Sequence, residues 1–380
     1  MDLLREISQL EDVIHQSSSG LPPELGPYYD AVLAMKDELR GQVVQNLDYL
    51  DLGLDVILPD LLSSTQTVTR SFALYNHMYV RSVLRAKHSD RLCLKTLRWL
   101  HSIHEQTRRV PVGLSDEEVS VVPMDPEISM TPAIYFLPCS VQYGLLYLPL
   151  FFHEIGHLLY AFHRREMDDL VRDLQGQIRG LLAPSVQRND QHARDDERLR
   201  GYIVQTWYSW TQELFCDAVG YSLGGPAFAS AFSMYLRLRG PDQYQVSPRR
   251  LVLRTHPVTW LRIRLLADRA RRAGRHHDAT SLEGAWDSIG AAMDVTEDYY
   301  GFYDDSFLDP VLSTIEDMLT ETEPRSFREH EGTAADPDAI PASPVYLLNT
   351  AWRQFLNNPD GYRSWEERAI ESFIATELPE

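Results

Sequence analysis

The sequence predicts an α+β fold that is mainly α-helical, in which a small β-sheet packs on one buried helix. Apolar residues recur at helical spacing through residues 1–108 and again through most of the chain after position 144. Three short β-favouring runs, bounded by Pro, Gly and Asp, lie between these two regions. Because the runs are few and the helical patterns long, we expect helices to form most of the core.

The first 108 residues are predicted to be a helical scaffold. In Met1–Gln16, for example, six apolar side chains follow a helical period, and a Ser/Gly/Pro-rich break at 17–26 ends the pattern. Further helical patterns cover residues 27–46, 63–87 and 90–108. No residue of this region demands a chemical role.

The β-favouring runs are expected to be strands at Val110–Val112, Val119–Val122 and Ala133–Leu137. We expect Ala133–Leu137 to form the edge of the sheet. An edge strand offers free N–H and C=O groups with which an extended substrate backbone can pair.

Helical patterns dominate the chain beyond the strands. They cover 144–180, with a break near Gly176, then 195–223, a helix that starts at Pro226, 257–272, 344–357 and 364–377. Polar, Pro-containing loops are expected at 183–194 and 323–343. These patterns suggest three regions, namely a helical region (1–108), a core region (109–275) and an acidic segment with C-terminal helices (276–380).

The composition excludes several classes of function. A formal net charge of −19 over 380 residues argues against nucleic-acid binding and against an anionic membrane surface. The three cysteines form no disulfide framework, and the N-terminus lacks the features of a signal peptide. The longest apolar stretch, 133–152, is interrupted by Pro, Gln and Gly, so it fits a buried strand and helix better than a bilayer crossing. We expect a soluble, cytoplasmic protein with no membrane insertion, and the oligomeric state stays open.

Charge is distributed unevenly in the second half of the chain. Residues 249–275 contain nine Arg and one Asp, whereas residues 294–338 contain fourteen acidic residues and two Arg. We expect these to be solvated faces that neutralise each other. The alternative is an acidic flap that regulates the site.

The motif His153-Glu154-Ile155-Gly156-His157 carries the chemistry. Residues four apart share a helix face, so both imidazoles can reach one metal ion, and Glu154 can reach a water on that ion without being a ligand. The flanking residues are apolar nearly all round the helix, and buried polar groups need partners. This pattern predicts a Zn²⁺ site whose water is activated by Glu154 as the general base.

Two residues compete for the third ligand position. His163 has the spacing of H-E-x-x-H-x-x-G-x-x-H, but Tyr160 stands where that pattern needs glycine, and in a continuous helix His163 faces elsewhere. Glu213 is followed four residues later by Asp217 on the next long helix. We therefore expect Glu213 to be the third ligand. We also expect Asp217 to accept the free N–H of a ligand histidine, namely His153.

HEIGH followed by ELFCDA resembles the gluzincin arrangement of zinc peptidases. The block Thr255-His256-Pro257 with Arg262-Ile263 is similar to the T-H-P-x-x-x-x-R-I element of HtpX-like and CAAX-prenyl-protease-like enzymes. The resemblance covers residues 133–270 and implies a zincin-like core. It also implies that His256 helps to stabilise the oxyanion and that Arg262 pairs with an acidic group that shapes the site. Those relatives are embedded in membranes, so their substrate class is not carried over.

The predicted function is that of a zinc metallopeptidase acting on a peptide or protein substrate. Besides His256, the side chains of Tyr202, Tyr208 and Tyr221 could supply an oxyanion donor. Two alternatives are a catalytically silent zinc-binding scaffold that recruits partners and a zinc amidohydrolase that is not a peptidase.

Overall fold

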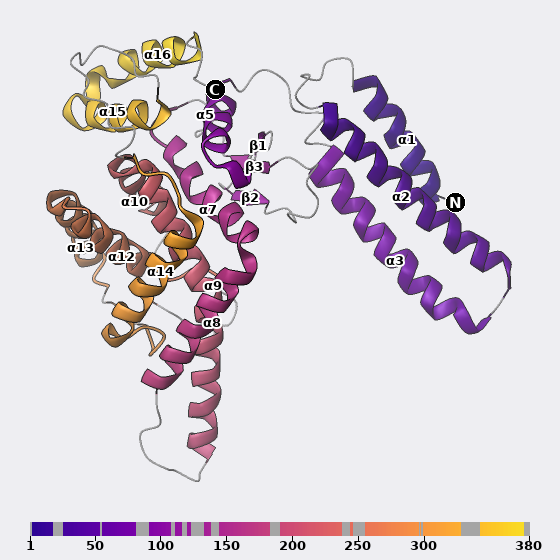
Figure 1. Cartoon of the computed structure of the whole chain (residues 1–380), viewed down its shortest axis with the longest axis horizontal. Coiled ribbons are helices and arrows are strands. Elements are labelled where there is room, and N and C mark those ends of the chain that lie inside the picture. The colour runs from indigo at the N-terminus through magenta and orange to yellow at the C-terminus, as the bar shows by residue number, and fades with distance from the viewer. Residues whose placement is uncertain are drawn as a thin grey trace. The chain divides into compact units, whose positions relative to one another are not determined.

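The chain folds into mainly helical structure in two compact units. The computed structural model describes residues 2–17, 26–53, 55–80, 91–107, 111–115, 120–122, 133–137, 144–182, 191–237, 244–245, 255–295, 297, 299–327 and 343–375. Unit 1 comprises residues 1–101 and 108–143, and unit 2 comprises residues 102–107 and 144–380 (Figure 1). The three regions expected from the sequence, with boundaries at 108/109 and 275/276, stay a prediction, because compactness alone does not define domains.

The N-terminal helices of unit 1 pack around a core of their own. α5 (Arg91–Ser102) follows later in the chain. The elements around this core are α1 (Asp2–Ser17), α2 (Gly26–Asp51), the 3₁₀ turn η3 (Asp55–Ile57), α3 (Leu58–Leu74) and the π-helical stretch η4 (Tyr75–Val80). Ile7, Val32 and Val68 are buried between them, and the Tyr75 hydroxyl donates to the Val32 carbonyl at 2.8 Å. The expected helices are confirmed, although α3 begins five residues early because Pro59 fits its first turn. Residues 81–90 lie outside the described part.

The three strands are confirmed, but their order differs from the expectation. They are β1 (Pro111–Ser115), β2 (Ser120–Val122) and β3 (Ala133–Leu137). β3 lies between a parallel β1 and an antiparallel β2, so it is the central strand, and the prediction that it forms the sheet edge is wrong. Apolar character is the physical reason, because the run AIYFL is suited to pairing on both sides and to burial. The sheet belongs to unit 1, and its packing on the HEIGH helix stays a prediction.

Unit 2 is built from helices that surround one long helix, α9. Its elements are η5 (Glu105–Thr107), η6 (Leu148–Leu150), α7 (Phe151–Phe162), α8 (Arg164–Leu181), α9 (Gln191–Gly224), α10 (Pro226–Arg237), α12 (Thr259–Arg272), α13 (His276–Ala292), η7 (Asp305–Phe307), α14 (Leu308–Thr322), α15 (Pro344–Asn357) and α16 (Pro359–Ala375). α9 contacts α7, α8, α10, α12, α14 and α15. Large aromatic side chains fill this core, among them the fully buried Trp207, Trp210 and Phe307.

Several boundaries in unit 2 differ from the sequence expectation. The helix predicted from 144 begins at Phe151, after η6, and the helix predicted from 364 begins at Pro359. The predicted helix over 144–180 is broken at His163, where the backbone leaves helical geometry, and it continues unbroken through Gly176. α9 begins at Gln191, inside the expected loop 183–194, whose residues 183–190 lie outside the described part. The helix start at Pro226 is confirmed.

The arginine-rich and acidic segments lie against each other in unit 2. Arg264 pairs with Glu297 at 3.1 Å, and Arg269 pairs with Glu316 at 2.8 Å. The middle of the acidic segment is α14, which packs on α8 and α9 and buries residues such as Ile315. This part of the acidic segment therefore belongs to the core, and the pairing is the neutralisation expected from the sequence.

Among the described residues, no helix is both long enough and apolar enough to cross a membrane.

Candidate metal centre

α7 presents His153, Glu154 and His157 inside unit 2. The helix is apolar on nearly every side, so its burial against α9 carries these polar residues into the interior. The side chain of His153 is 9% exposed, whereas that of His157 is 26% exposed. Because the residue Glu154 is also buried, the site opens to solvent on the His157 side.

Glu213 from α9 reaches both histidines of α7. Its Oε2 lies 3.4 Å from Nε2 of His153, and its Oε1 lies 3.8 Å from Nε2 of His157. Two ligand atoms of a tetrahedral zinc ion, each about 2.1 Å from the metal, are about 3.4 Å apart. Glu213 therefore faces each ring with a different oxygen, at distances close to that spacing.

Asp217, one turn after Glu213, faces the other nitrogen of His153. Its Oδ1 lies 2.9 Å from Nδ1 of His153. The ring N–H is not directed along a regular hydrogen bond, so the contact is mainly electrostatic. This position is the one that a carboxylate needs in order to select the His153 tautomer that leaves Nε2 free for a metal.

Arg262 from α12 holds the Asp217 carboxylate. Its Nε and Nη2 each donate to Asp217 at 2.8 Å, and Nη2 also lies 3.4 Å from Glu213 Oε2. The guanidinium is 6% exposed. A buried guanidinium with two parallel hydrogen bonds fixes the carboxylate in orientation as well as in charge.

His256 lies at the exposed edge of the site, just before α12. Its Nε2 is 3.3 Å from Glu213 Oε2, and its Nδ1 is 2.9 Å from the Thr255 hydroxyl. The side chain is 54% exposed. It can therefore reach both the carboxylate and a molecule that arrives from solvent.

Phe232 from α10 is a site residue that the sequence analysis missed. Its ring stacks on His153, with the centroids 5.9 Å apart, and the guanidinium of Arg262 lies 4.7 Å from its centroid on a face. The only signal in the sequence was the apolar periodicity of 226–237, which does not distinguish Phe232 from other core residues. The ring holds two polar groups of the site in place.

The pKa shifts describe an environment that favours a cation at His153. Burial alone lowers the pKa of His153, but Asp217 and Glu213 outweigh it and raise the pKa to about 10. Burial, and then the neighbouring His153, lower the pKa of His157 to about 4. Burial opposes the charge of Glu213, yet His153 and Arg262 hold the pKa of this carboxyl below its usual value. The two carboxylates therefore stabilise positive charge on His153, while His157 stays neutral.

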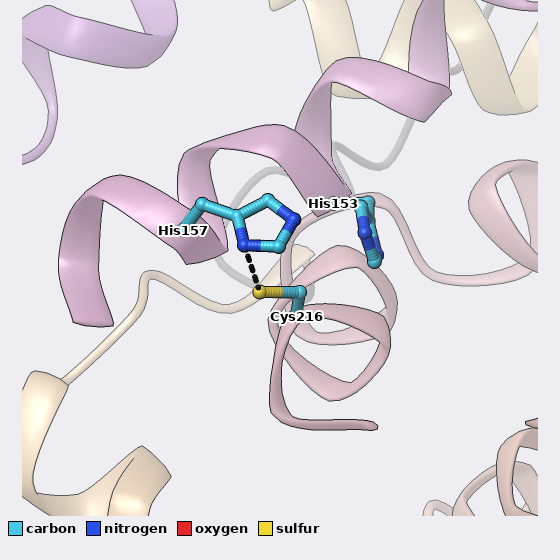
Figure 2. A group of neighbouring side chains, drawn as sticks. All are labelled: His153, His157 and Cys216. Carbon is cyan, nitrogen blue, oxygen red and sulfur yellow. Dashed lines mark hydrogen bonds between the residues drawn. The ribbon is translucent and has the colours of Figure 1, made fainter. Parts of the chain in front are cut away.

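Cys216 offers a second possible ligand set. The group His153, His157 and Cys216 places one ligand atom of each residue within 4.8 Å of the others. Cys216 Sγ lies 3.4 Å from Nδ1 of His157 (Figure 2), whereas Glu213 faces Nε2 of the same ring. Because the two nitrogens point in different directions, one ion cannot use both sets. Burial raises the pKa of the Cys216 thiol well above its usual value, which disfavours the thiolate that a metal needs.

The other residues considered in the sequence analysis face elsewhere. Nδ1 of His163 lies 3.5 Å from Glu321 of α14. The Tyr208 hydroxyl donates to Asp168 at 2.7 Å. Tyr202 and Tyr221 lie on α9 eleven residues before and eight residues after Glu213, about 16 and 12 Å along the helix axis. Of the oxyanion donors considered, His256 is the one beside the cluster.

No protein family, curated protein or solved structure matches the chain. The functional argument therefore rests on the geometry of the residues themselves.

Proposed function

We propose that the chain is a zinc-dependent metallopeptidase of the gluzincin type, in which His153, His157 and Glu213 hold the metal. One observation carries the proposal. Glu213, 56 positions after His157, brings its two oxygens to 3.4 and 3.8 Å from the Nε2 atoms of the two histidines. Two imidazoles and one carboxylate are three protein ligands, and a catalytic zinc site keeps a further position open.

The residues around the ligands support a hydrolytic role. A bound zinc ion supplies Lewis-acid chemistry, which polarises a carbonyl group and makes water more acidic. Glu154, adjacent to His153, takes a proton from the attacking water and returns it to the leaving amine. His256, at the exposed edge, donates a hydrogen bond to the carbonyl oxygen as negative charge develops on it. Asp217 and Arg262 keep His153 oriented.

The substrate is a peptide or protein that enters from the side of His157 and His256. These are the more exposed residues of the cluster, at 26% and 54%. The same groups would hydrolyse another amide, so an amidohydrolase that is not a peptidase would differ from this proposal only in its substrate. A zinc-binding scaffold would differ in having no catalytic turnover.

Metal content tests the ligand set. Elemental mass spectrometry should find near one zinc per wild-type chain, and Glu213→Ala should lose it or bind it much more weakly. Cys216→Ser, three residues further along α9, is the matched control variant, and it should keep the zinc. A reversed result, with zinc lost from Cys216→Ser and kept by Glu213→Ala, would assign the ligand role to the thiol. After reconstitution with Co²⁺, an intense near-ultraviolet thiolate band would show the same.

Hydrolysis tests the role of Glu154. Glu154→Gln should retain zinc and lose about 100-fold or more of the cleavage rate, because general-base catalysis contributes roughly that much or more. A mixed peptide library read by mass spectrometry measures the cleavage. Glu166→Gln, an exposed change on α8, is the control and should cleave like the wild type. Full activity in Glu154→Gln would rule out the general-base role, and a zinc-loaded wild type that cleaves nothing would favour the scaffold.

A further inference from the structure

A second possible site lies in unit 2 between α10, α13 and α15, which are rose, brown and yellow in Figure 1. These helices line a cavity of about 780 Å³ that is open to solvent on one side. Small-molecule sites have volumes of roughly 300–1,000 Å³. The metal-centre residues do not line this cavity. On α10, Phe232 contacts His153, whereas Ser233 and Arg237 line the cavity.

We propose that this cavity binds a small organic anion that carries phosphate or carboxylate groups on an apolar body. Arg237, Arg275 and Arg353 line it, and Asp278 is the one carboxylate among its described lining residues. This positive excess contrasts with the net charge of −19 for the whole chain. The average composition of the chain therefore does not explain the excess of arginine among the lining residues.

Two of these guanidinium groups have no carboxylate partner among the residues that the structure describes. Arg237 donates to the Ser233 hydroxyl at 3.2 Å, and Arg353 donates to the Thr350 hydroxyl at 3.0 Å. Both side chains are exposed, so an anion in the cavity can reach them and accept their remaining N–H groups. Arg275 lies 3.8 Å from Asp278, so it is already partly neutralised.

Helix ends add positive potential to the same cavity. The first turns of α13 and α15 line it through His277 and Tyr346. Their N-cap residues, Arg275 and Ser343, make no side-chain cap hydrogen bond. Backbone N–H groups at such helix starts attract anions, and here two starts support the arginines.

Apolar side chains form the rest of the wall. Trp352 and Leu282 line the cavity, and the guanidinium of Arg353 lies 5.8 Å from the ring centroid of Tyr346. An aromatic or alicyclic ligand body can pack on these groups while its acidic groups face the arginines. This mixture of surfaces excludes a purely inorganic ion as the best ligand.

Isothermal titration calorimetry of the full chain at low salt tests the proposal, with phenyl phosphate and benzene-1,3,5-tricarboxylate as probes. We expect saturable one-to-one binding of at least one probe, and the probe that binds tells phosphate from carboxylate recognition. Arg237→Gln with Arg353→Gln should weaken binding at least about tenfold, because charged hydrogen bonds are lost. Arg363→Gln, an exposed arginine on α16, is the matched control and should bind like the wild type. If the double variant is not folded by circular dichroism, the two single variants replace it.

Binding must also persist in Glu213→Ala, which separates the cavity from the metal centre. If neither probe binds below millimolar concentration, the proposal is wrong. Equal binding by wild type and the arginine variants would overturn it as well, and so would loss of binding in Glu213→Ala alone.

Discussion

At the scale of single residues, the Asp217–Arg262 pair decides how His153 is held. Both side chains are nearly inaccessible, at 5% and 6% exposure, and they share two hydrogen bonds of 2.8 Å. The carboxylate then faces Nδ1 of His153. Removing the guanidinium takes both of these hydrogen bonds from the buried Asp217 and leaves His153 as its remaining partner. Loss of a buried charge partner is far more costly than the loss of an exposed pair.

Arg262→Leu should therefore destabilise the protein by about 3–5 kcal/mol. Urea unfolding followed by circular dichroism measures the change in the free energy of unfolding. Arg363→Leu breaks an exposed pair with Glu367 at 3.2 Å, and it should cost less than about 1 kcal/mol. Similar losses in the two variants would mean that Asp217 finds another positive partner in the folded protein.

At the scale of elements, the close crossing of α7 and α9 builds the proposed metal centre. A Cβ at Gly156 would lie 2.8 Å from the Cα of Cys216, a backbone atom that cannot rotate away. The glycine lies between His153 and His157, so the closest approach of the two helices falls within the motif itself. This approach is what brings Glu213 within reach of both rings.

Gly156→Ala should push the two helices apart, destabilise the protein by about 1–3 kcal/mol and weaken zinc binding. Gly176→Ala is the matched control, because nothing lies within 4 Å of its added Cβ. Alanine is favoured over glycine in a helix, so this control should be neutral or stabilising by up to about 1 kcal/mol. Thermal unfolding and metal titration measure both effects. Unchanged zinc affinity in Gly156→Ala would separate the helix crossing from the site.

At the scale of the whole molecule, each of the two compact units has buried residues of its own. Unit 1 buries residues such as Ile7, Val68 and Tyr75, whereas unit 2 buries Trp207, Trp210 and Trp286. A ligand that binds only the folded form stabilises the part of the chain that binds it. Because the proposed ligands all belong to unit 2, zinc should act on that unit first.

Calorimetry should resolve two unfolding transitions, and added zinc should raise the temperature of only one. At a free zinc concentration 100 times the Kd, the stabilisation is about 2.7 kcal/mol. Trp99 is the one tryptophan of the seven that belongs to unit 1, so Trp99→Phe makes tryptophan fluorescence a probe of unit 2 alone. The zinc-dependent transition should be the one that fluorescence follows. A single unfolding transition would contradict the assignment of zinc binding to unit 2. So would a zinc-dependent transition in calorimetry that the fluorescence of Trp99→Phe does not follow.

Local sequence patterns determined most of the helices and the pairs of side chains that share a helix face. The periodicity of 1–16, the helix start at Pro226 and the i,i+4 spacings of His153 with His157 and Glu213 with Asp217 all follow from hydrogen bonds within one or two turns. These features depend only on residues that are near in the chain, so they can be predicted from the sequence directly. The position of β3 within the sheet depends instead on which strands pair, and the sequence analysis predicted it wrongly.

Only the tertiary structure decided which of these local pairs meet. Glu213 reaches the histidines because Gly156 lets α7 lie directly against Cys216 of α9, and Phe232 joins the site because α10 folds back beside it. The break at His163 likewise belongs to packing, since that residue turns toward Glu321 of α14. Contacts between residues more than fifty positions apart depend on how helix faces fit together, and that fit is a property of the whole core. The sequence by itself therefore determined the candidate ligands, and the packing of α7 against α9 determined that Glu213 lies beside both histidines.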